Sequence, residues 1–186
     1  MLYLKLNISL MRTATQKFTQ FGIDKLEIPT RLGYHNRYLT DSELRRLYPR
    51  LSEYFEEFVE YMAGQMRDSI KKAIELQRYR TKWKPLSIPY MKYKRLHHLS
   101  LKTWKSTGFL YRSIAYKKHN DHYIIGINPF LRYRNGMRVI DVAKYIEYGT
   151  RKMPARPLFR PIIFEMRKNL KKYWITFLKE KKGIRI

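Results

Sequence analysis

The side chains that most often perform acid–base or metal chemistry, 15 Asp and Glu and 5 His among 186 residues, are scattered along this chain. His97 and His98 are adjacent, so in regular structure their side chains would point in different directions. His119 and His122 bracket a turn, but only Asp121 stands near them as a further metal ligand. The chain has no cysteine, which excludes disulfides, thiolate metal sites and cysteine nucleophiles. We therefore expect no metal site and no cofactor.

The carboxylates and hydroxyls form no catalytic pattern either. Four glutamates recur at the spacing of a solvated helix face: Glu53, Glu56, Glu57 and Glu60. Ser106, Thr107 and Ser113 are more simply explained as helix caps and turn residues than as nucleophiles. The sequence contains no G-x-S-x-G, Walker or H-E-x-x-H motif. We therefore expect that the protein is not an enzyme.

The charge is strongly positive and unevenly distributed. Lys and Arg number 40 against 15 Asp and Glu, a formal net charge of +25. Residues 1–75 carry 12 basic and 10 acidic side chains, whereas residues 76–186 carry 28 and 5, a net charge of +23. A field of this size exceeds what solubility needs and favours polyanions or acidic protein surfaces. The sequence therefore indicates an anionic partner for residues 76–186.

Aromatic and basic residues alternate in the region that opens this cationic part. The aromatic members are Tyr79, Trp83, Tyr90, Tyr93 and Trp104; the basic ones are Arg78, Arg80, Lys82, Lys84, Lys92, Lys94, Arg95, Lys102 and Lys105. Such a mixture neutralises phosphates and stacks on unpaired bases. It is equally typical of core or interface anchors surrounded by a cationic rim. Both interpretations remain open from the sequence.

The elements that must position these residues begin with a strand and an arm. Alternating apolar residues from Leu2 to Leu10 predict a half-buried strand within residues 1–12. Residues 13–40 read as an extended arm or loop that contacts a neighbouring subunit. Residues 41–78 form a long helical region, with a break or kink at Pro49. Its apolar stripe is Leu51, Phe55, Phe58, Met62, Met66, Ile70 and Ile74.

The second half predicts shorter elements. Residues 79–105 read as irregular, followed by a short helix capped by Ser106 or Thr107. Strands are expected over 114–118 and 123–127, and a basic loop over 130–138. Residues 140–148 form a short helix or an extended edge that ends at Gly149. A last helix is expected over 161–182, with its stop at Gly183.

These elements make one domain, residues 1–186, of α+β class. We expect a small, mainly antiparallel sheet packed with one long helix and a C-terminal helix, plus an extended N-terminal arm. The first residues lack the continuous apolar run of a signal peptide, and no stretch is apolar enough to span a membrane. We therefore expect a soluble protein that is made in the cytosol and has no membrane partner.

Two separated blocks of sequence resemble those of tailed-phage virion-morphogenesis proteins. The first runs from Trp83-Lys84-Pro85-Leu86-Ser87 to Ser106-Thr107-Gly108-Phe109-Leu110-Tyr111-Arg112-Ser113-Ile114. It is similar to the family spacing W-x-P-L followed by L-x-x-T-G-x-L-x-x-S-I. The second, Tyr145-Ile146-Glu147-Tyr148-Gly149-Thr150 with Ala155-Arg156-Pro157-Leu158-Phe159-Arg160-Pro161, resembles Y-x-E-x-G-T followed by A-R-P-F-L-x-P. The blocks occur in the family's order and cover less than half of the chain.

The resemblance implies a structural protein of the head–tail junction that completes the tail or neck. Its partners would be itself, as a hexameric ring, together with portal, adaptor or stopper proteins, tail-tube or terminator proteins, and packaged DNA. It would be located in the virion, after assembly in the host cytoplasm. The extra residues 12–45 and the heavy basic load depart from the family pattern. The alternative is a nucleic-acid-binding protein without sequence specificity.

The resemblance also selects the candidate site residues. The assembly or fold motif consists of Trp83, Pro85, Leu86, Thr107, Gly108, Leu110, Ser113, Glu147, Gly149, Thr150, Ala155, Pro157, Phe159 and Pro161. Candidate contacts to DNA or an acidic partner ring are Arg138, Arg151, Lys152, Arg156 and Arg160. Gly149 would supply a turn, and Pro161 suits the first turn of the final helix.

Overall fold

The fold is of α+β class, as predicted. The computed structural model describes the backbone of residues 3–7, 27–30, 33–36, 41–120 and 122–183, and the side chains of residues 54–120 and 122–183. A three-stranded antiparallel sheet has the order β1-β5-β4, formed by Tyr3–Asn7, His122–Ile127 and Ile114–His119. Glu27–Thr30 and Gly33–Asn36 pair separately as an antiparallel hairpin, β2 and β3. Most of the predicted arm, residues 13–40, lies outside the described residues.

The β4–β5 hairpin confirms the two strands predicted from the sequence. His119 pairs with His122 at its end, and Asn120 takes the left-handed conformation with φ 51°. Asparagine tolerates that conformation better than most residues, which explains the tight turn. Ile125 and Ile127 of β5 are buried, so this strand carries the core face of the sheet.

The long helix α2 spans Asp41–Glu75 and confirms the predicted helical region. The expectation at Pro49 was a break or a kink, and because the helix continues through this residue the break is wrong. The stripe residues on the part with described side chains are all buried: Phe55, Phe58, Met62, Met66, Ile70 and Ile74. A proline inside a helix costs about 3 kcal/mol, whereas each buried large apolar side chain contributes about 1.5–3 kcal/mol. Burial of six such side chains therefore outweighs the cost of one proline.

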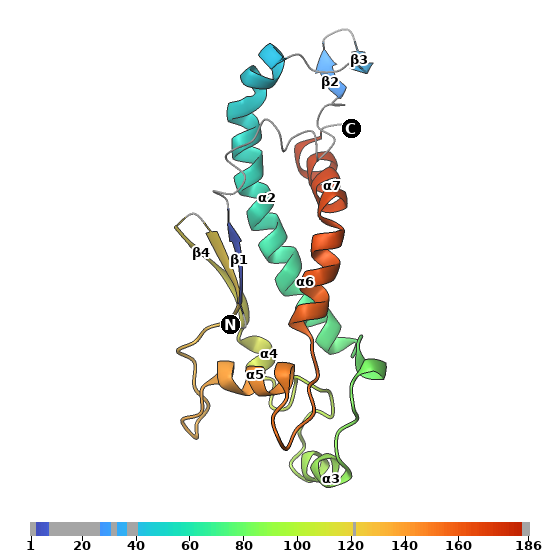
Figure 1. Ribbon diagram of the computed structural model, residues 1–186, viewed down its shortest axis with the longest axis vertical. Coiled ribbons are helices and arrows are strands. Elements are labelled where there is room, and N and C mark those ends of the chain that lie inside the picture. The colour runs from blue at the N-terminus through green and yellow to red at the C-terminus, as the bar shows by residue number, and fades with distance from the viewer. Residues whose placement is uncertain (1–2, 8–26, 31–32, 37–40, 121, 184–186) are drawn as a thin grey trace.

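Figure 1 shows α2 between the sheet and the C-terminal helices. On one flank it contacts β4 and β5, and on the other α6 and α7, which span Phe159–Lys168 and Leu170–Lys182. An aromatic cluster of Phe55, Phe58, Trp174 and Phe177 fills the helical interface, with the Phe55 and Trp174 rings stacked 4.6 Å apart. The core therefore lies along both faces of α2.

The single C-terminal helix expected over 161–182 is two helices. Asn169 separates them, and its side-chain Nδ2 donates to the carbonyl of Glu165 at 2.8 Å. An asparagine that bonds a nearby carbonyl competes with the backbone pattern of a helix. Pro161 does lie in the first turn of α6, and Gly183, with φ 64°, ends α7, both as predicted.

Short helices gather at the end of the molecule opposite helix α7 (Figure 1). They are η4, α3, α4 and α5, formed by Arg80–Lys82, Ile88–Leu96, Phe109–Arg112 and Val139–Tyr148. Helix α3 corrects the expectation that residues 79–105 are irregular throughout; Pro89 stands in its first turn, where a missing N–H costs nothing. Helix α5 resolves the choice left open for 140–148 in favour of a helix that ends at Gly149.

The expected side-chain cap of α4 was wrong. Gly108 occupies the cap position with φ 80°, and no side chain caps that helix end. The Thr107 hydroxyl accepts only a 3.3 Å bond from the Phe109 N–H. A left-handed residue at this place favours glycine over serine or threonine.

No helix among the described residues is long and apolar enough to cross a membrane.

Candidate functional site

The two blocks that carry the resemblance meet in space through their tryptophans. Indole Nε1 of Trp83 donates to the carbonyl of Pro157 at 2.9 Å, and Nε1 of Trp104 donates to the carbonyl of Arg156 at 3.0 Å. Both indoles are buried. Ring–ring contact of Trp104 with Phe159, at 5.6 Å, adds to this junction. Segments more than 50 residues apart in sequence therefore form one unit.

Glu147, which lies on α5, binds the same unit through hydrogen bonds. Its carboxylate is fully buried and accepts hydrogen bonds from the backbone N–H groups of Leu158, Phe159 and Arg160 at 2.7, 3.1 and 3.1 Å. Those N–H groups begin α6 and have no partner within the helix. A negative group at a helix N-terminus also complements the helix dipole. Glu147 is thus a remote cap for α6, a role that the sequence motif did not reveal.

A tight turn follows Gly149. Its φ is 78°, and a Cβ there would lie 2.8 Å from the backbone nitrogen of Ala155. The Thr150 hydroxyl accepts bonds from the N–H groups of Lys152 and Met153 at 3.3 and 3.1 Å. The turn therefore holds residues 153–157 against α5, confirming the turn role predicted for Gly149, and leaves Lys152 exposed at its tip.

Arg156 corrects the predicted set of partner contacts because it is buried, with 5% of its surface exposed. Its Nε donates to the carbonyl of Lys84 at 3.0 Å and its Nη2 to that of Pro85 at 3.1 Å. A longer bond, 3.5 Å, joins Nη1 to the Pro154 carbonyl. Arg156 thus ties the first block to the second and cannot lie on an open surface against a phosphate backbone.

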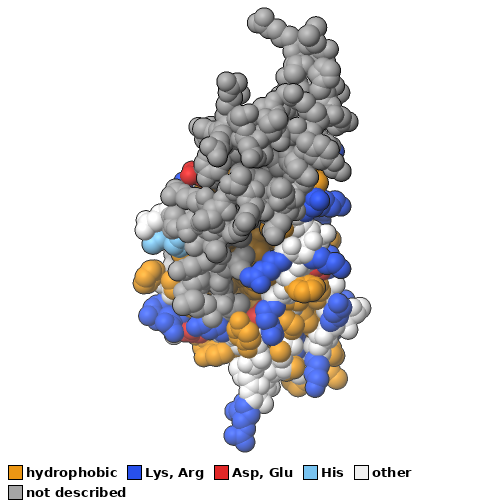
Figure 2. All heavy atoms as spheres, turned by 45° about the horizontal axis from the view of Figure 1, so that its top comes forward, with side chains coloured by type: hydrophobic (Ala, Val, Ile, Leu, Met, Phe, Trp, Pro, Cys, Tyr) orange, Lys and Arg blue, Asp and Glu red, His pale blue; other side chains and the backbone are white. Residues whose placement is uncertain are grey.

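The other four candidate cations are exposed. Arg151 and Lys152 project from the turn after α5. Arg138 is paired with Asp141 by two bonds, of 2.7 and 3.1 Å, which leaves it less available to a partner. Arg160 contacts Glu147 at 3.3 Å and lies 5.0 Å from the ring of Tyr148. Figure 2 shows many Lys and Arg side chains and few acidic ones on the visible face of the described residues.

The remaining motif residues shape the fold around this unit. Leu110 and Phe159 are buried, and the buried Ser113 hydroxyl donates to the carbonyl of Leu110 at 2.7 Å. A Cβ on Gly108 would lie 2.8 Å from the Arg112 side chain. Ala155 and Pro85 are exposed, and Leu86 is half-buried.

The aromatic residues of 79–105 divide into two groups. Tyr79, Trp83 and Trp104 are buried, so their faces are closed to a nucleic-acid base. Burial, with the nearby Glu165 carboxylate, raises the pKa of Tyr79 to about 12. Tyr90 and Tyr93 remain exposed and stack on each other with ring centroids 6.3 Å apart. Most of the predicted stacking platform therefore serves as anchors.

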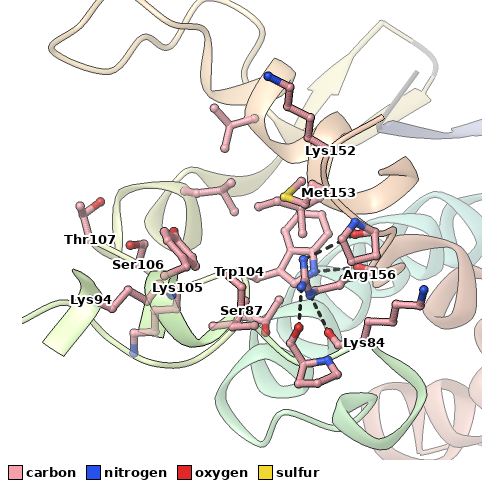
Figure 3. Close-up of a pocket in the computed structure, with 18 of the residues that line it drawn as sticks. Lys84, Ser87, Lys94, Trp104, Lys105, Ser106, Thr107, Lys152, Met153 and Arg156 are labelled. Atoms are coloured by element: carbon pink, nitrogen blue, oxygen red, sulfur yellow. Dashed lines mark hydrogen bonds between the residues drawn. The ribbon is translucent and has the colours of Figure 1, made fainter. Parts of the chain in front are cut away.

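A cavity of about 740 Å³ opens between α3, α5 and the turn at 150–153 (Figure 3). Its apolar wall includes Leu86, Trp104, Leu110, Val142, Ile146 and Met153. Five cations also line it, namely Lys84, Lys94, Lys105, Lys152 and Arg156, and no acidic residue among the described ones does. Its size lies within the range of roughly 300–1,000 Å³ typical of ligand pockets. The cavity is thus apolar and cationic at once.

Lys94 belongs to the cations predicted to neutralise phosphates or to form a cationic rim, but it is buried. Only 2% of its surface is exposed, and its Nζ donates to the carbonyls of Ser100 and Lys102 at 2.8 and 3.1 Å. Burial, and to a smaller extent the charge of Arg156, lowers the pKa of Lys94. No sequence signal distinguishes it from the surrounding exposed lysines.

The structure offers no metal site in the part of the chain that it describes. The rings of His119 and His122 lie 5.1 Å apart, but no three His, Asp or Glu side chains within residues 54–120 and 122–183 gather around one point. Glu56, Glu57 and Glu60 are exposed, in agreement with the solvated helix face predicted for them. Glu57 pairs with Lys182 at 2.7 Å, and Glu60 accepts a bond from Tyr123 at 3.2 Å.

Comparison with known proteins gives no relative: no family model, no curated protein and no solved structure matches this chain.

Proposed function

We propose that this chain is a structural protein of the tailed-phage head–tail junction, which forms a ring that completes the tail or neck. The observation that carries the proposal is the junction of Trp83, Trp104 and Glu147 with residues 156–160. The two blocks that resemble the virion-morphogenesis family are one hydrogen-bonded unit here. Their joint occurrence therefore corresponds to one structural requirement rather than to two unrelated coincidences.

The basic surface supports the same proposal. Among the described residues of 79–160, every exposed Asp, Glu, Lys or Arg side chain is cationic, including Arg151, Lys152 and Arg160. A cationic surface of this kind suits either DNA that passes through a ring or an acidic surface on an adjacent ring. In such a protein the site is a shaped surface, and catalysis is not part of the role that we propose.

The experiment is deletion of the coding sequence from the phage genome that carries it. We expect filled capsids and separate tails that fail to join, together with restoration of intact particles when the chain is supplied in trans. Mass spectrometry of purified wild-type virions should find the chain in a small fixed copy number. Normal particles after deletion, or absence of the chain from mature virions, would reject the proposal.

The second candidate is a nucleic-acid-binding protein without sequence specificity. Its support is the net charge of +23 on residues 76–186, together with the exposed, stacked pair Tyr90 and Tyr93. The buried state of Trp83 and Trp104 weakens it, because stacking needs open ring faces. This candidate predicts tight DNA binding by the isolated monomer, with affinity that falls steeply as salt rises, and weak binding at moderate salt would count against it.

A further inference from the structure

Lys94 and Arg156 place two buried positive charges beside the same cavity. Both line it, and both have at least nine-tenths of their surface buried. Their described partners are neutral carbonyl groups: Ser100 and Lys102 for Lys94, and Lys84, Pro85 and Pro154 for Arg156. No carboxylate among the described residues pairs with either. A buried charge without a counter-ion is costly, and an anion that enters the cavity would offset that cost.

Both groups keep hydrogen-bonding capacity for such an anion. An ammonium group has three N–H donors and a guanidinium group has five. Lys94 gives two bonds and Arg156 gives three to the described residues. Lys94 is further restrained by Tyr90, whose ring centroid lies 5.3 Å from its Nζ. The remaining donors can serve an acceptor that is not part of the described chain.

The walls specify the rest of the ligand. Leu86, Leu110, Val142 and Ile146 offer aliphatic surface, so an inorganic anion alone would leave most of the cavity unfilled. Tyr90 and Met137 also line the cavity, yet 42% and 46% of their surface is exposed. The apolar wall therefore continues outward at the mouth. This continuation suits an extended chain more than a small molecule that the cavity would enclose.

We propose that this cavity binds a short segment of another protein chain in which apolar side chains flank a carboxylate. The carboxylate lies against Lys94 and Arg156, and the apolar side chains contact Val142, Ile146 and Leu110. The acidic character of the partner follows from the unpaired charges, and its apolar character follows from the walls. This binding does not depend on the proposed role at the head–tail junction.

The test uses the immobilised 186-residue chain and two pools of blocked octapeptides. Each peptide has one central residue, which is Glu in one pool and Gln in the other. Leu, Val and Phe residues flank this central residue, and Gly and Ser stand at both ends. Mass spectrometry of the retained peptides measures binding. We expect retention of the Glu pool to exceed that of the Gln pool at least about tenfold, because a buried charge pair contributes more than 1.4 kcal/mol. Equal retention of the two pools, or retention of neither, overturns the proposal.

Two variants locate the binding. Lys94→Met keeps a side chain of similar length without charge and should lower retention of the Glu pool about tenfold or more. Lys117→Met, the same change at an exposed position on β4, should leave retention unchanged. Val142→Phe fills the cavity from α5 with both cations intact and should abolish retention. It keeps the test decisive if Lys94→Met fails to fold; undiminished retention by Val142→Phe would exclude this cavity.

A competition experiment distinguishes a peptide ligand from a small-molecule ligand. Octanoate carries an apolar chain and a carboxylate without a peptide backbone. The proposal expects octanoate to compete with the Glu pool only weakly, because it cannot contact the wall outside the mouth. Tight binding of octanoate with no retained peptide would assign the cavity to a small carboxylate and overturn the proposal. Neither retention of the Glu pool nor its absence tests the head–tail proposal, because that proposal is tested on virions.

Discussion

The carboxylate of Glu147 accepts the backbone N–H of Leu158 at 2.7 Å, and with it the first N–H groups of α6. Glu147→Ala would leave three N–H groups without a partner, of which those of Leu158 and Phe159 are buried and that of Arg160 is partly buried. A buried donor that loses its partner costs about 1–3 kcal/mol, so we expect a loss of at least about 3 kcal/mol of unfolding free energy. Urea unfolding followed by far-UV circular dichroism measures it.

Two controls sharpen the interpretation of Glu147. Glu147→Gln keeps one acceptor oxygen and should cost less than Glu147→Ala. Glu56→Ala, on the exposed face of α2, should change the unfolding free energy by no more than about 0.5 kcal/mol. A change at Glu147 as small as that at Glu56 would contradict the capping role.

Arg156 separates a structural role from a nucleic-acid role. Arg156→Met leaves the carbonyls of Lys84 and Pro85 without their donor, and we expect it to lower the unfolding free energy by roughly 1–3 kcal/mol. The slope of log affinity for DNA against log salt concentration should stay unchanged. The double variant Arg151→Ala, Lys152→Ala should show the opposite: unchanged stability and, if DNA is the partner, a slope reduced by about 2.

The measurement for this pair is fluorescence anisotropy of labelled duplex DNA over a salt series, with thermal unfolding in parallel. A reduced slope for Arg156→Met at normal stability would return that residue to the set of phosphate contacts. Unchanged slopes for both variants would remove DNA as the partner of this turn.

Gly149 offers a test of close backbone approach. Gly149→Ala would bring a Cβ to 2.8 Å from the Ala155 nitrogen and 2.9 Å from the Met153 carbonyl oxygen, at a φ of 78°. We expect a loss of about 3 kcal/mol or more, because both strain and collision act. Gly136→Ala shares a positive φ of 81° but meets nothing within 4 Å, so it should cost about 1 kcal/mol. Equal losses in chemical denaturation would show that collision plays no part.

Glu75 should give the protein a dependence on acid. Hydrogen bonds from Lys102 and Lys105 lower the pKa of Glu75 to about 2 in the folded protein, below the ordinary value of 4.5. Because the pKa of Glu75 is lower in the folded protein, the contribution of Glu75 to stability is fully present above pH 4.5 and is lost as the pH falls through about 2. We expect Glu75→Gln to flatten the decline of melting temperature between these pH values.

Glu180→Gln, an exposed carboxylate of α7, is the matched control for Glu75. Its melting temperature should decline with acid as steeply as that of the wild-type chain. A decline in Glu75→Gln that matches the wild type as well would show that the pairs with Lys102 and Lys105 contribute nothing to the acid dependence.

Regular periodicity made the large elements predictable from sequence. Phe55, Phe58 and Met62 recur at helical spacing, and Asn120 marks the turn of the β4–β5 hairpin, so α2 and the hairpin were found. Helix α3 was missed because its Lys and Tyr residues give a weak apolar stripe. Pro89 favours an irregular chain in a sequence pattern, although a proline is also common in the first turn of a helix.

The site was only partly predictable. The sequence brought Trp83, Glu147 and Pro157 into one motif by resemblance, but it did not give their contacts. The sequence predicts Arg156 as a contact to DNA or an acidic ring, and Lys94 as a phosphate-neutralising or rim cation, because Lys and Arg are almost never fully buried. Their partners are backbone carbonyls, whose positions depend on how loops from distant parts of the chain pack. Such burial has no local sequence pattern.

The hydrogen bonds that hold residues 154–160 have a consequence for the order in which the chain folds. The hydrogen bonds that Trp83 and Arg156 make with the opposite block connect residues that are 71 to 74 positions apart in the sequence. Contacts at such large sequence separations form slowly during folding. During synthesis from the N-terminus, α2 and the region around Trp83 and Trp104 leave the ribosome well before residues 154–160 exist. The indole N–H groups of Trp83 and Trp104 therefore lack their carbonyl acceptors until residues 156 and 157 have been synthesised. The last fifth of the chain therefore completes the junction, and truncation before residue 157 should leave α2 helical but these tryptophans exposed.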